Sequence, residues 1–67
     1  MSLQHKVGEE IARARQSAGV TQQELARLSK TRQANISRLE RGIQNPSVEF
    51  LERVAKALGR KIRIRLD

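Results

Sequence analysis

The sequence predicts an all-α domain of four helices, followed by one short C-terminal β-strand. Apolar residues recur at every third or fourth position in four segments, which is the period of a helix with one buried face. Each segment follows a Ser or Thr that can cap a helix, and three of the four segments end at a glycine. Within the 67 residues, only the last few alternate with the period of two that indicates a strand.

The first helix is predicted from Leu3 to Ala18, because Ser2 can cap its start and Gly19 can end it in a left-handed conformation. Its apolar stripe consists of Leu3, Val7, Ile11, Ala14 and Ala18. Gly8 lies inside this helix, where it lowers the helix propensity and marks either a close contact or nothing.

Two short helices follow, and they are predicted at residues 21–29 and 32–41. Thr21 and Glu24 form the T-x-x-E pattern of a capping box at the start of the second helix. Thr31 is the N-cap candidate of the third helix, which stops at Gly42. Ile36 and Leu39 give this third helix a narrow apolar stripe, so most of its surface should lie outside the core.

The fourth helix is predicted between Ser47, its N-cap, and Gly59. Its expected buried face is formed by Val48, Leu51, Val54, Ala55 and Leu58.

The C-terminal segment, residues 59–67, is predicted to be a dimerisation strand. Three basic side chains alternate there with Ile62, Ile64 and Leu66. A lone strand cannot satisfy its own backbone hydrogen bonds. We therefore expect it to pair with the same strand of a second copy across a two-fold axis. The alternative is a disordered basic tail.

Charge and composition narrow the class of partner. Lys and Arg number 14 against 7 Asp and Glu, which gives a net charge of +7 and favours a polyanionic partner. Phe50 is the one aromatic residue, whereas proteins that bind single strands or RNA usually stack bases on several aromatic side chains. Double-stranded DNA is therefore the expected partner.

The two short helices and their tight turn are typical of a helix-turn-helix motif. From Ile11 to Leu58 the sequence resembles the Cro/phage-repressor, or XRE-type, helix-turn-helix family. The resemblance rests on the blocks TQQELA, ISRLERG and NPSVEFLERVAKALG, which occur in the family's order and spacing. It implies a lambda-repressor-like fold, with residues 1–67 as a single XRE-type domain.

The resemblance also implies a role for several residues. The base-contacting positions on the third, recognition helix correspond to Gln33, Ala34, Ser37 and Arg38. Phosphate contacts are expected at Gln22, Lys30, Arg32, Asn35, Gln44 and Asn45. Arg15 and Glu40 match a partly buried ion pair that links the first helix to the third.

The residue types on the third helix also indicate, without the family resemblance, that its outward side contacts DNA bases. At 100° per residue, Gln33, Ser37 and Arg41 lie near one line of the third helix, and Ala34 and Arg38 lie beside it. Ile36 and Leu39 lie on the opposite side and anchor the helix. Arg38 can bind guanine O6 and N7, Gln33 can bind adenine, and the Ala34 methyl suits a thymine methyl. Arg38 as a simple phosphate contact remains an alternative, as does Glu40 as a reader of cytosine.

Lys30 departs from the family pattern, which has a left-handed glycine at that place in the turn. Either the turn is distorted, or Lys30 accepts the left-handed conformation and adds a phosphate contact.

We therefore predict a sequence-specific DNA-binding transcriptional repressor that acts as a homodimer on an inverted repeat. The end of the chain, LERVAKALGRKIRIRLD, resembles DNA-binding antitoxins, which makes a cognate toxin a further candidate partner. A phage-type repressor, a restriction–modification controller and a protein-interaction module of the same fold are the alternatives. The sequence shows no catalytic constellation, metal site, cofactor motif or ligand domain, so we expect no cofactor and no small-molecule ligand. His5 is the single histidine, and there is no cysteine. With no membrane-length apolar run and no signal-peptide pattern, we expect a cytoplasmic protein.

Overall fold

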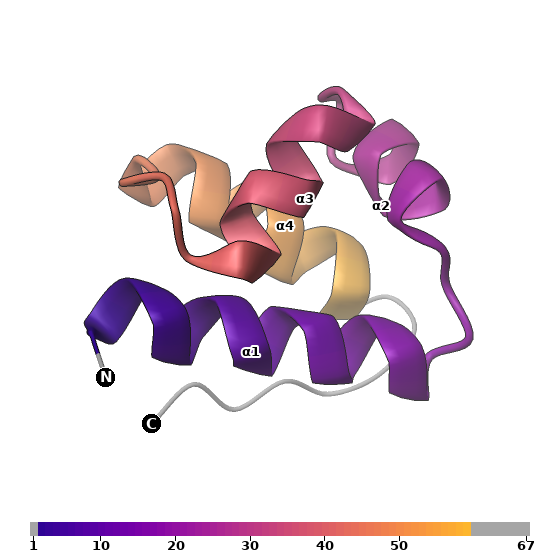
Figure 1. Cartoon of the computed structure of the whole chain (residues 1–67). Coiled ribbons are helices and arrows are strands. Elements are labelled where there is room, and N and C mark those ends of the chain that lie inside the picture. The colour runs from indigo at the N-terminus through magenta and orange to yellow at the C-terminus, as the bar shows by residue number, and fades with distance from the viewer. Residues whose placement is uncertain (1, 60–67) are drawn as a thin grey trace.

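The computed structural model describes residues 2–59, which form four α-helices and no strand within that range (Figure 1). The helices are α1 (Leu3–Ser17), α2 (Gln22–Leu28), α3 (Gln33–Arg41) and α4 (Val48–Gly59). In Figure 1, α1 runs beneath α3 and α4, while α2 and α3 meet at the tight turn. The predicted strand, with Ile62, Ile64 and Leu66, lies outside the described residues.

Three of the four predicted caps are confirmed. The Ser2 hydroxyl accepts a hydrogen bond from the His5 backbone N–H at 3.2 Å. Thr21 and Glu24 form the reciprocal capping box, with both hydrogen bonds at 3.0 Å. The Ser47 hydroxyl accepts from the Phe50 N–H at 3.1 Å. These local bonds satisfy backbone donors that a helix start leaves free, so the sequence sets where three helices begin.

The fourth predicted cap is wrong. Arg32, not Thr31, is the N-cap of α3, and its side chain makes no capping hydrogen bond. The Thr31 N–H instead bonds to the Ala26 carbonyl at 2.9 Å and so belongs to the end of α2. The Thr31 hydroxyl is free to accept from Asn35 Nδ2 at 2.8 Å, within α3.

One core combines residues from every helix and from the α1–α2 loop. Its buried members are Ile11, Ala14, Val20, Leu25, Ala26, Ile36, Leu39, Val54, Ala57 and Leu58. The buried face of α4 differs from the prediction, because Val48 is 71% exposed and Ala57 takes the place expected for Ala55. Val48 is the first residue of the helix, where the core has already ended.

Gly8 marks a close crossing of α1 and α3. A Cβ atom added to Gly8 would collide with the Leu39 carbonyl oxygen and would lie 2.7 Å from the carbonyl oxygen of Glu40. The absence of a side chain therefore lets the two backbones touch, which places the C-terminal half of α3 directly on α1. None of the four described helices is long and apolar enough to cross a membrane.

Candidate nucleic-acid interface

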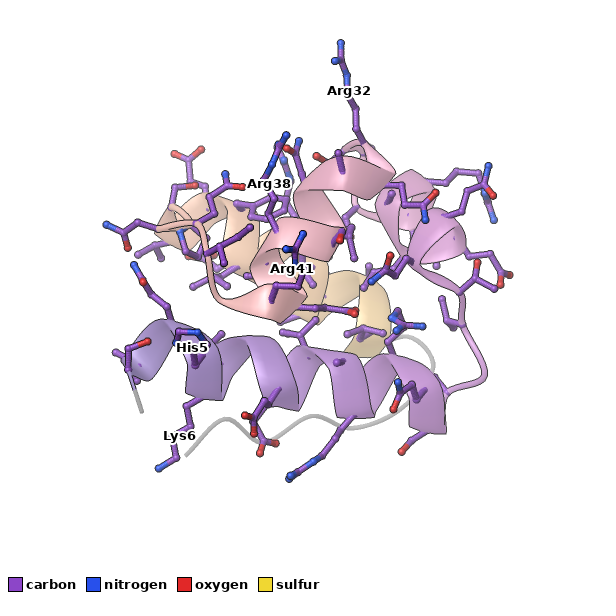
Figure 2. All side chains as sticks on the ribbon, in the orientation of Figure 1. His5, Lys6, Arg32, Arg38 and Arg41 are labelled. Carbon is purple, nitrogen blue, oxygen red and sulfur yellow. The ribbon has the colours of Figure 1, made fainter. Side chains whose placement is uncertain are left out.

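The recognition helix α3 divides its residues between two faces. Ile36 and Leu39 are buried in the core and fix the helix to the domain. Gln33, Ala34 and Arg38 are exposed, and Ser37 beside them is half-buried. The four residues predicted to contact bases therefore share the outward side of one helix, and Figure 2 shows Arg38 extending away from the core there. A helix presented in this way can enter the major groove of B-DNA.

Hydrogen bonds within α3 hold the Arg38 side chain. Its guanidinium donates to Asn35 Oδ1 at 3.2 Å. The Asn35 amide nitrogen in turn donates to the Thr31 hydroxyl. Both polar atoms of the Asn35 side chain are thus engaged, one by Arg38 within α3 and one by Thr31 just before it, in an arrangement that orients Arg38. Asn35 as a phosphate contact stays a prediction.

Arg15 and Glu40 join α1 to α3 through a two-pronged ion pair. Arg15 Nε donates to Glu40 Oε2 at 2.6 Å, and its Nη2 donates to Oε1 at 3.1 Å. The remaining Nη1 donates to the Val20 carbonyl at 2.9 Å. The two side chains are only 14% and 6% exposed, so the Glu40 carboxylate is directed into the domain and not toward solvent.

Gln22 extends this buried pair toward the recognition surface. Its amide nitrogen donates to Glu40 Oε1 at 3.0 Å, and its amide oxygen accepts from Gln33 Nε2 at 3.5 Å. The chain Arg15–Glu40–Gln22–Gln33 therefore connects α1 to a predicted base-contacting residue. Gln22 keeps its place at the N-terminus of α2, where helix N–H groups favour a phosphate.

Lys30 adopts the left-handed conformation, with φ of 58°. The turn is therefore not distorted, and Lys30 takes the left-handed conformation that the family gives to glycine. The Lys30 N–H bonds to the Arg27 carbonyl at 3.2 Å, so the end of α2 is closed in the manner of a helix that ends at glycine. The side chain itself is exposed.

The remaining predicted phosphate contacts lie at both ends of α3. Arg32 is exposed at its start and projects away from the molecule in Figure 2. Asn45 is exposed in the loop after α3, whereas Gln44 is half-buried and its Oε1 is enclosed without a hydrogen-bond partner. The structure thus leaves Arg32 and Asn45 open to solvent and holds Gln44 partly inward.

The sequence places Arg41 on the same line of the helix as Gln33 and Ser37 but assigns it no contact. In the structure Arg41 is exposed on α3, and Figure 2 shows it near Arg38. The signal was present, since Arg41 follows Ser37 by four residues and Arg38 by three. Within residues 2–59 no group of three or more His, Cys, Asp or Glu side chains could hold a metal ion. His5 Nδ1 lies 2.7 Å from the Ser2 hydroxyl.

Known proteins are similar to this chain in both sequence and fold. A helix-turn-helix family model matches residues 11–64. An uncharacterized HTH-type transcriptional regulator, y4dJ, of Sinorhizobium fredii is 42% identical over 88% of this chain and 77% of its own length. A second uncharacterized HTH-type transcriptional regulator, from Haemophilus influenzae, is 36% identical, and the match spans 82% of this chain and 56% of that protein.

The clp gene regulator ClgR of Corynebacterium glutamicum has a similar structure. Its crystal structure superposes with a TM-score of 0.86 at 37% identity, over 88% of this chain and 76% of that one. The family match covers most of this chain, and the curated relatives are named as transcriptional regulators. The chain therefore belongs to the XRE-type helix-turn-helix family, a DNA-binding and non-enzymatic family of transcriptional regulators.

Proposed function

We propose that the protein is a repressor that binds a specific inverted repeat in double-stranded DNA as a homodimer. The observation that carries this proposal is the outward face of α3, where Gln33, Ala34, Ser37 and Arg38 lie together on a helix fixed from behind by the core. A net charge of +7 supplies the attraction to phosphate that such binding needs.

The mechanism follows from this geometry. The α3 helix enters the major groove, Arg38 and Gln33 contact base edges, and the Ala34 methyl packs on a thymine methyl. The N-terminus of α2, Arg32 and the loop after α3 bind the flanking phosphates. In a two-fold dimer the two recognition helices lie about 34 Å apart, so each reads one half-site on the same side of the duplex. Occupancy of the operator then excludes polymerase.

Selection from a random duplex library tests the proposal. The expected product is an inverted repeat whose half-site centres lie about 10 base pairs apart. Binding to that duplex is then measured in a salt series, where log K should fall steeply against log salt, by about 0.9 for each phosphate contacted. Failure to enrich any sequence, combined with no binding to duplex DNA at low salt, would contradict the proposal and favour a protein-interaction module.

An antitoxin role is the more specific form of this proposal. It is supported by the sequence pattern of a fourth helix followed by a basic alternating segment, LERVAKALGRKIRIRLD. The test is the adjacent reading frame in the genome, which should encode a protein that arrests growth when expressed alone and is neutralised by this chain. A neighbouring frame without toxicity would instead favour a phage-type repressor or a restriction–modification controller. Both versions act in the cytoplasm.

A further inference from the structure

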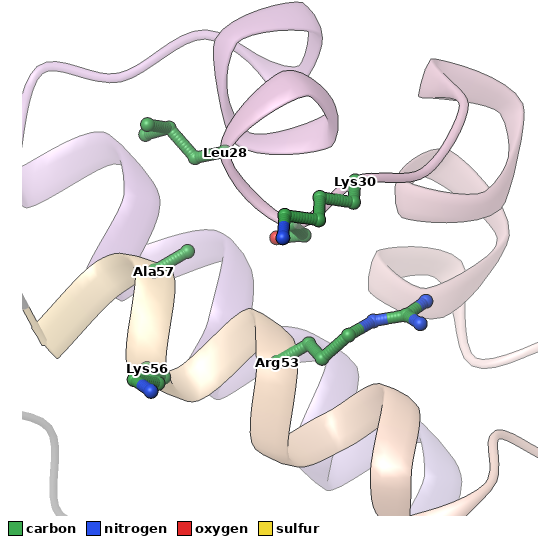
Figure 3. A pocket seen from close by; sticks show the side chains of 6 residues that line it. Leu28, Lys30, Arg53, Lys56 and Ala57 are labelled. Carbon is green, nitrogen blue, oxygen red and sulfur yellow. The ribbon is translucent and has the colours of Figure 1, made fainter.

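A small cavity lies between the end of α2 and the side of α4 (Figure 3). It is lined by Leu28, Ser29, Lys30, Arg53, Lys56 and Ala57 and has a volume of about 170 Å³. Pockets for drug-sized ligands start at about 300 Å³, whereas one water takes about 30 Å³ of liquid. The cavity therefore suits a single small chemical group rather than a base or a sugar.

The lining of this cavity is strongly basic. Lys30, Arg53 and Lys56 come from two separate elements, and no acidic residue among those that the structure describes lines the cavity with them. Glu49 and Glu52 precede Arg53 and Lys56 by four residues on α4, but neither acid forms an ion pair with them within the described residues. Three cationic residues therefore line one hollow, while Glu49 and Glu52 line a neighbouring hollow together with Arg53 and Lys56, and the excess of positive charge in the first hollow favours an anion there.

The Arg53 side chain is also held in place. Its guanidinium carbon lies 5.7 Å from the centre of the Phe50 ring, one turn earlier on α4. This cation–π contact restrains the arginine on the side of the cavity.

Ser29 adds a neutral donor. The residue is 1% exposed, and its hydroxyl has no hydrogen-bond partner among residues 2–59. Its backbone N–H is already used, because it bonds to the Leu25 carbonyl at 2.8 Å as part of the helix end. A buried hydroxyl without a partner is rare in folded proteins and calls for a bound water or ion.

Lys30 is positioned at some cost. Its φ of 58° puts a lysine in a conformation that glycine adopts far more easily. The same conformation closes the end of α2 through the hydrogen bond from the Lys30 N–H to the Arg27 carbonyl. Here the conformation places a cationic side chain next to Ser29, at the junction of α2 and the cavity.

We infer that this cavity binds one phosphate-type oxyanion. Lys30, Arg53 and Lys56 neutralise its charge, and the Ser29 hydroxyl donates a hydrogen bond to one of its oxygens. The phosphate group belongs either to a free phosphorylated molecule or to the DNA backbone. The inference does not depend on the proposed operator or on the residues of α3.

Inorganic phosphate is the probe for the first experiment. The full chain is titrated with phosphate at constant ionic strength, with chloride as the balancing ion, while backbone amide NMR shifts are recorded. Saturable shifts are expected at Ser29, Lys30, Arg53 and Lys56. The exposed double variant Arg53→Gln/Lys56→Gln should weaken phosphate binding at least tenfold, and Ser29→Ala should also weaken it.

Lys6→Gln is the matched control, because Lys6 is an exposed lysine on α1 that points away from the rest of the molecule in Figure 2. It should bind phosphate as the unmodified protein does. Linear, non-saturating shifts would overturn the inference, because they would show that the cavity has no specific site for phosphate. Equal binding by the double variant and by Lys6→Gln would overturn it as well. Because no DNA is used, this result is independent of any test of operator binding.

A second experiment identifies the source of the phosphate. The double variant and the unmodified protein are compared for duplex binding over a salt series. If a backbone phosphate occupies the cavity, the slope of log K against log salt should fall by about 0.9 for that contact, and phosphate should compete with DNA. If the ligand is a free phosphorylated molecule, the slope should stay the same and phosphate should bind the protein–DNA complex.

Discussion

Arg38 is exposed on α3, and Asn35 holds its guanidinium from within the helix. Arg38→Ala is expected to cost about 1–3 kcal/mol of operator binding and to relax specificity at one base pair, because a bidentate contact with guanine is lost. Affinity for the operator and for single-base variants of it would be measured by fluorescence anisotropy. Lys6→Ala removes the same charge from α1 and should leave the base preference intact. An equal loss on every sequence would identify Arg38 as a phosphate contact instead.

We predict that the ion pair between Arg15 and Glu40 stabilises the fold and makes no contact with DNA. Glu40→Ala would leave the Arg15 guanidinium buried without its partner, which typically costs about 3–5 kcal/mol of unfolding free energy. Urea denaturation measures the loss. Glu10→Ala is the matched control, since Glu10 pairs with Arg13 at 3.5 Å on an exposed surface of α1. That exposed pair should contribute about 0–1 kcal/mol. Similar losses for both variants would contradict this account of the buried pair.

Lys30 stores strain that glycine would remove. Lys30→Gly should raise the unfolding free energy by about 0.5–1 kcal/mol, because relief of the left-handed conformation outweighs the added flexibility of the unfolded chain. Thermal unfolding gives the sign of the change. Lys30→Ala removes the same charge but keeps the Cβ atom, so it should not stabilise the protein. If both variants stabilise it equally, charge repulsion rather than backbone strain is the cause.

At the scale of elements, the crossing of α1 and α3 depends on Gly8. Alanine normally stabilises a helix relative to glycine by about 0.5–1 kcal/mol. Gly8→Ala should nevertheless destabilise the protein, because the new Cβ meets carbonyl oxygens of α3 that cannot move without shifting the recognition helix. Gly59→Ala is the control, since no atom of the part of the chain that the structure describes lies within 4 Å of a Cβ at that position. Circular dichroism during heating measures both changes, and a stabilised Gly8→Ala would disprove the close contact.

The same scale shows which elements the sequence can predict. The four helices and three caps follow from local patterns, because a cap and its partner lie three residues apart. The start of α3 was misplaced at Thr31, since its hydroxyl has two local uses and bonds to the Asn35 side chain instead. Val48 matched the apolar period of α4, but the period alone does not say where the core ends.

At the scale of the whole molecule, contacts between distant segments explain what the sequence missed. The outward side of α3 was predictable, because its period and the family resemblance indicate the same residues. The link from Gln22 to Glu40 spans 18 residues, and no local pattern specifies it. The basic cavity likewise combines Lys30 with Arg53 from another helix, so only the fold brings them together.

Dimerisation is the property of the whole molecule on which the proposed operator depends. We predict that the C-terminal residues pair two copies through Ile62, Ile64 and Leu66. Replacing these three residues with serine keeps the basic side chains between them and the net charge of +7. The variant should sediment as a monomer, because the apolar contact between paired strands is lost while backbone pairing alone is weak in water.

The serine triple variant should keep its helical domain folded but should bind the operator more weakly. The core residues that the structure describes all lie between Ile11 and Leu58, outside the substituted segment, so we expect the far-ultraviolet circular dichroism of helix to remain. Operator affinity should fall to that of one half-site, because the second recognition helix is no longer held about 34 Å from the first. Val48→Ser is the matched control, since Val48 is an exposed apolar residue at the start of α4. If Val48→Ser gives the monomer and the serine triple variant stays dimeric, the two copies meet at α4 instead and the paired-strand interface is wrong.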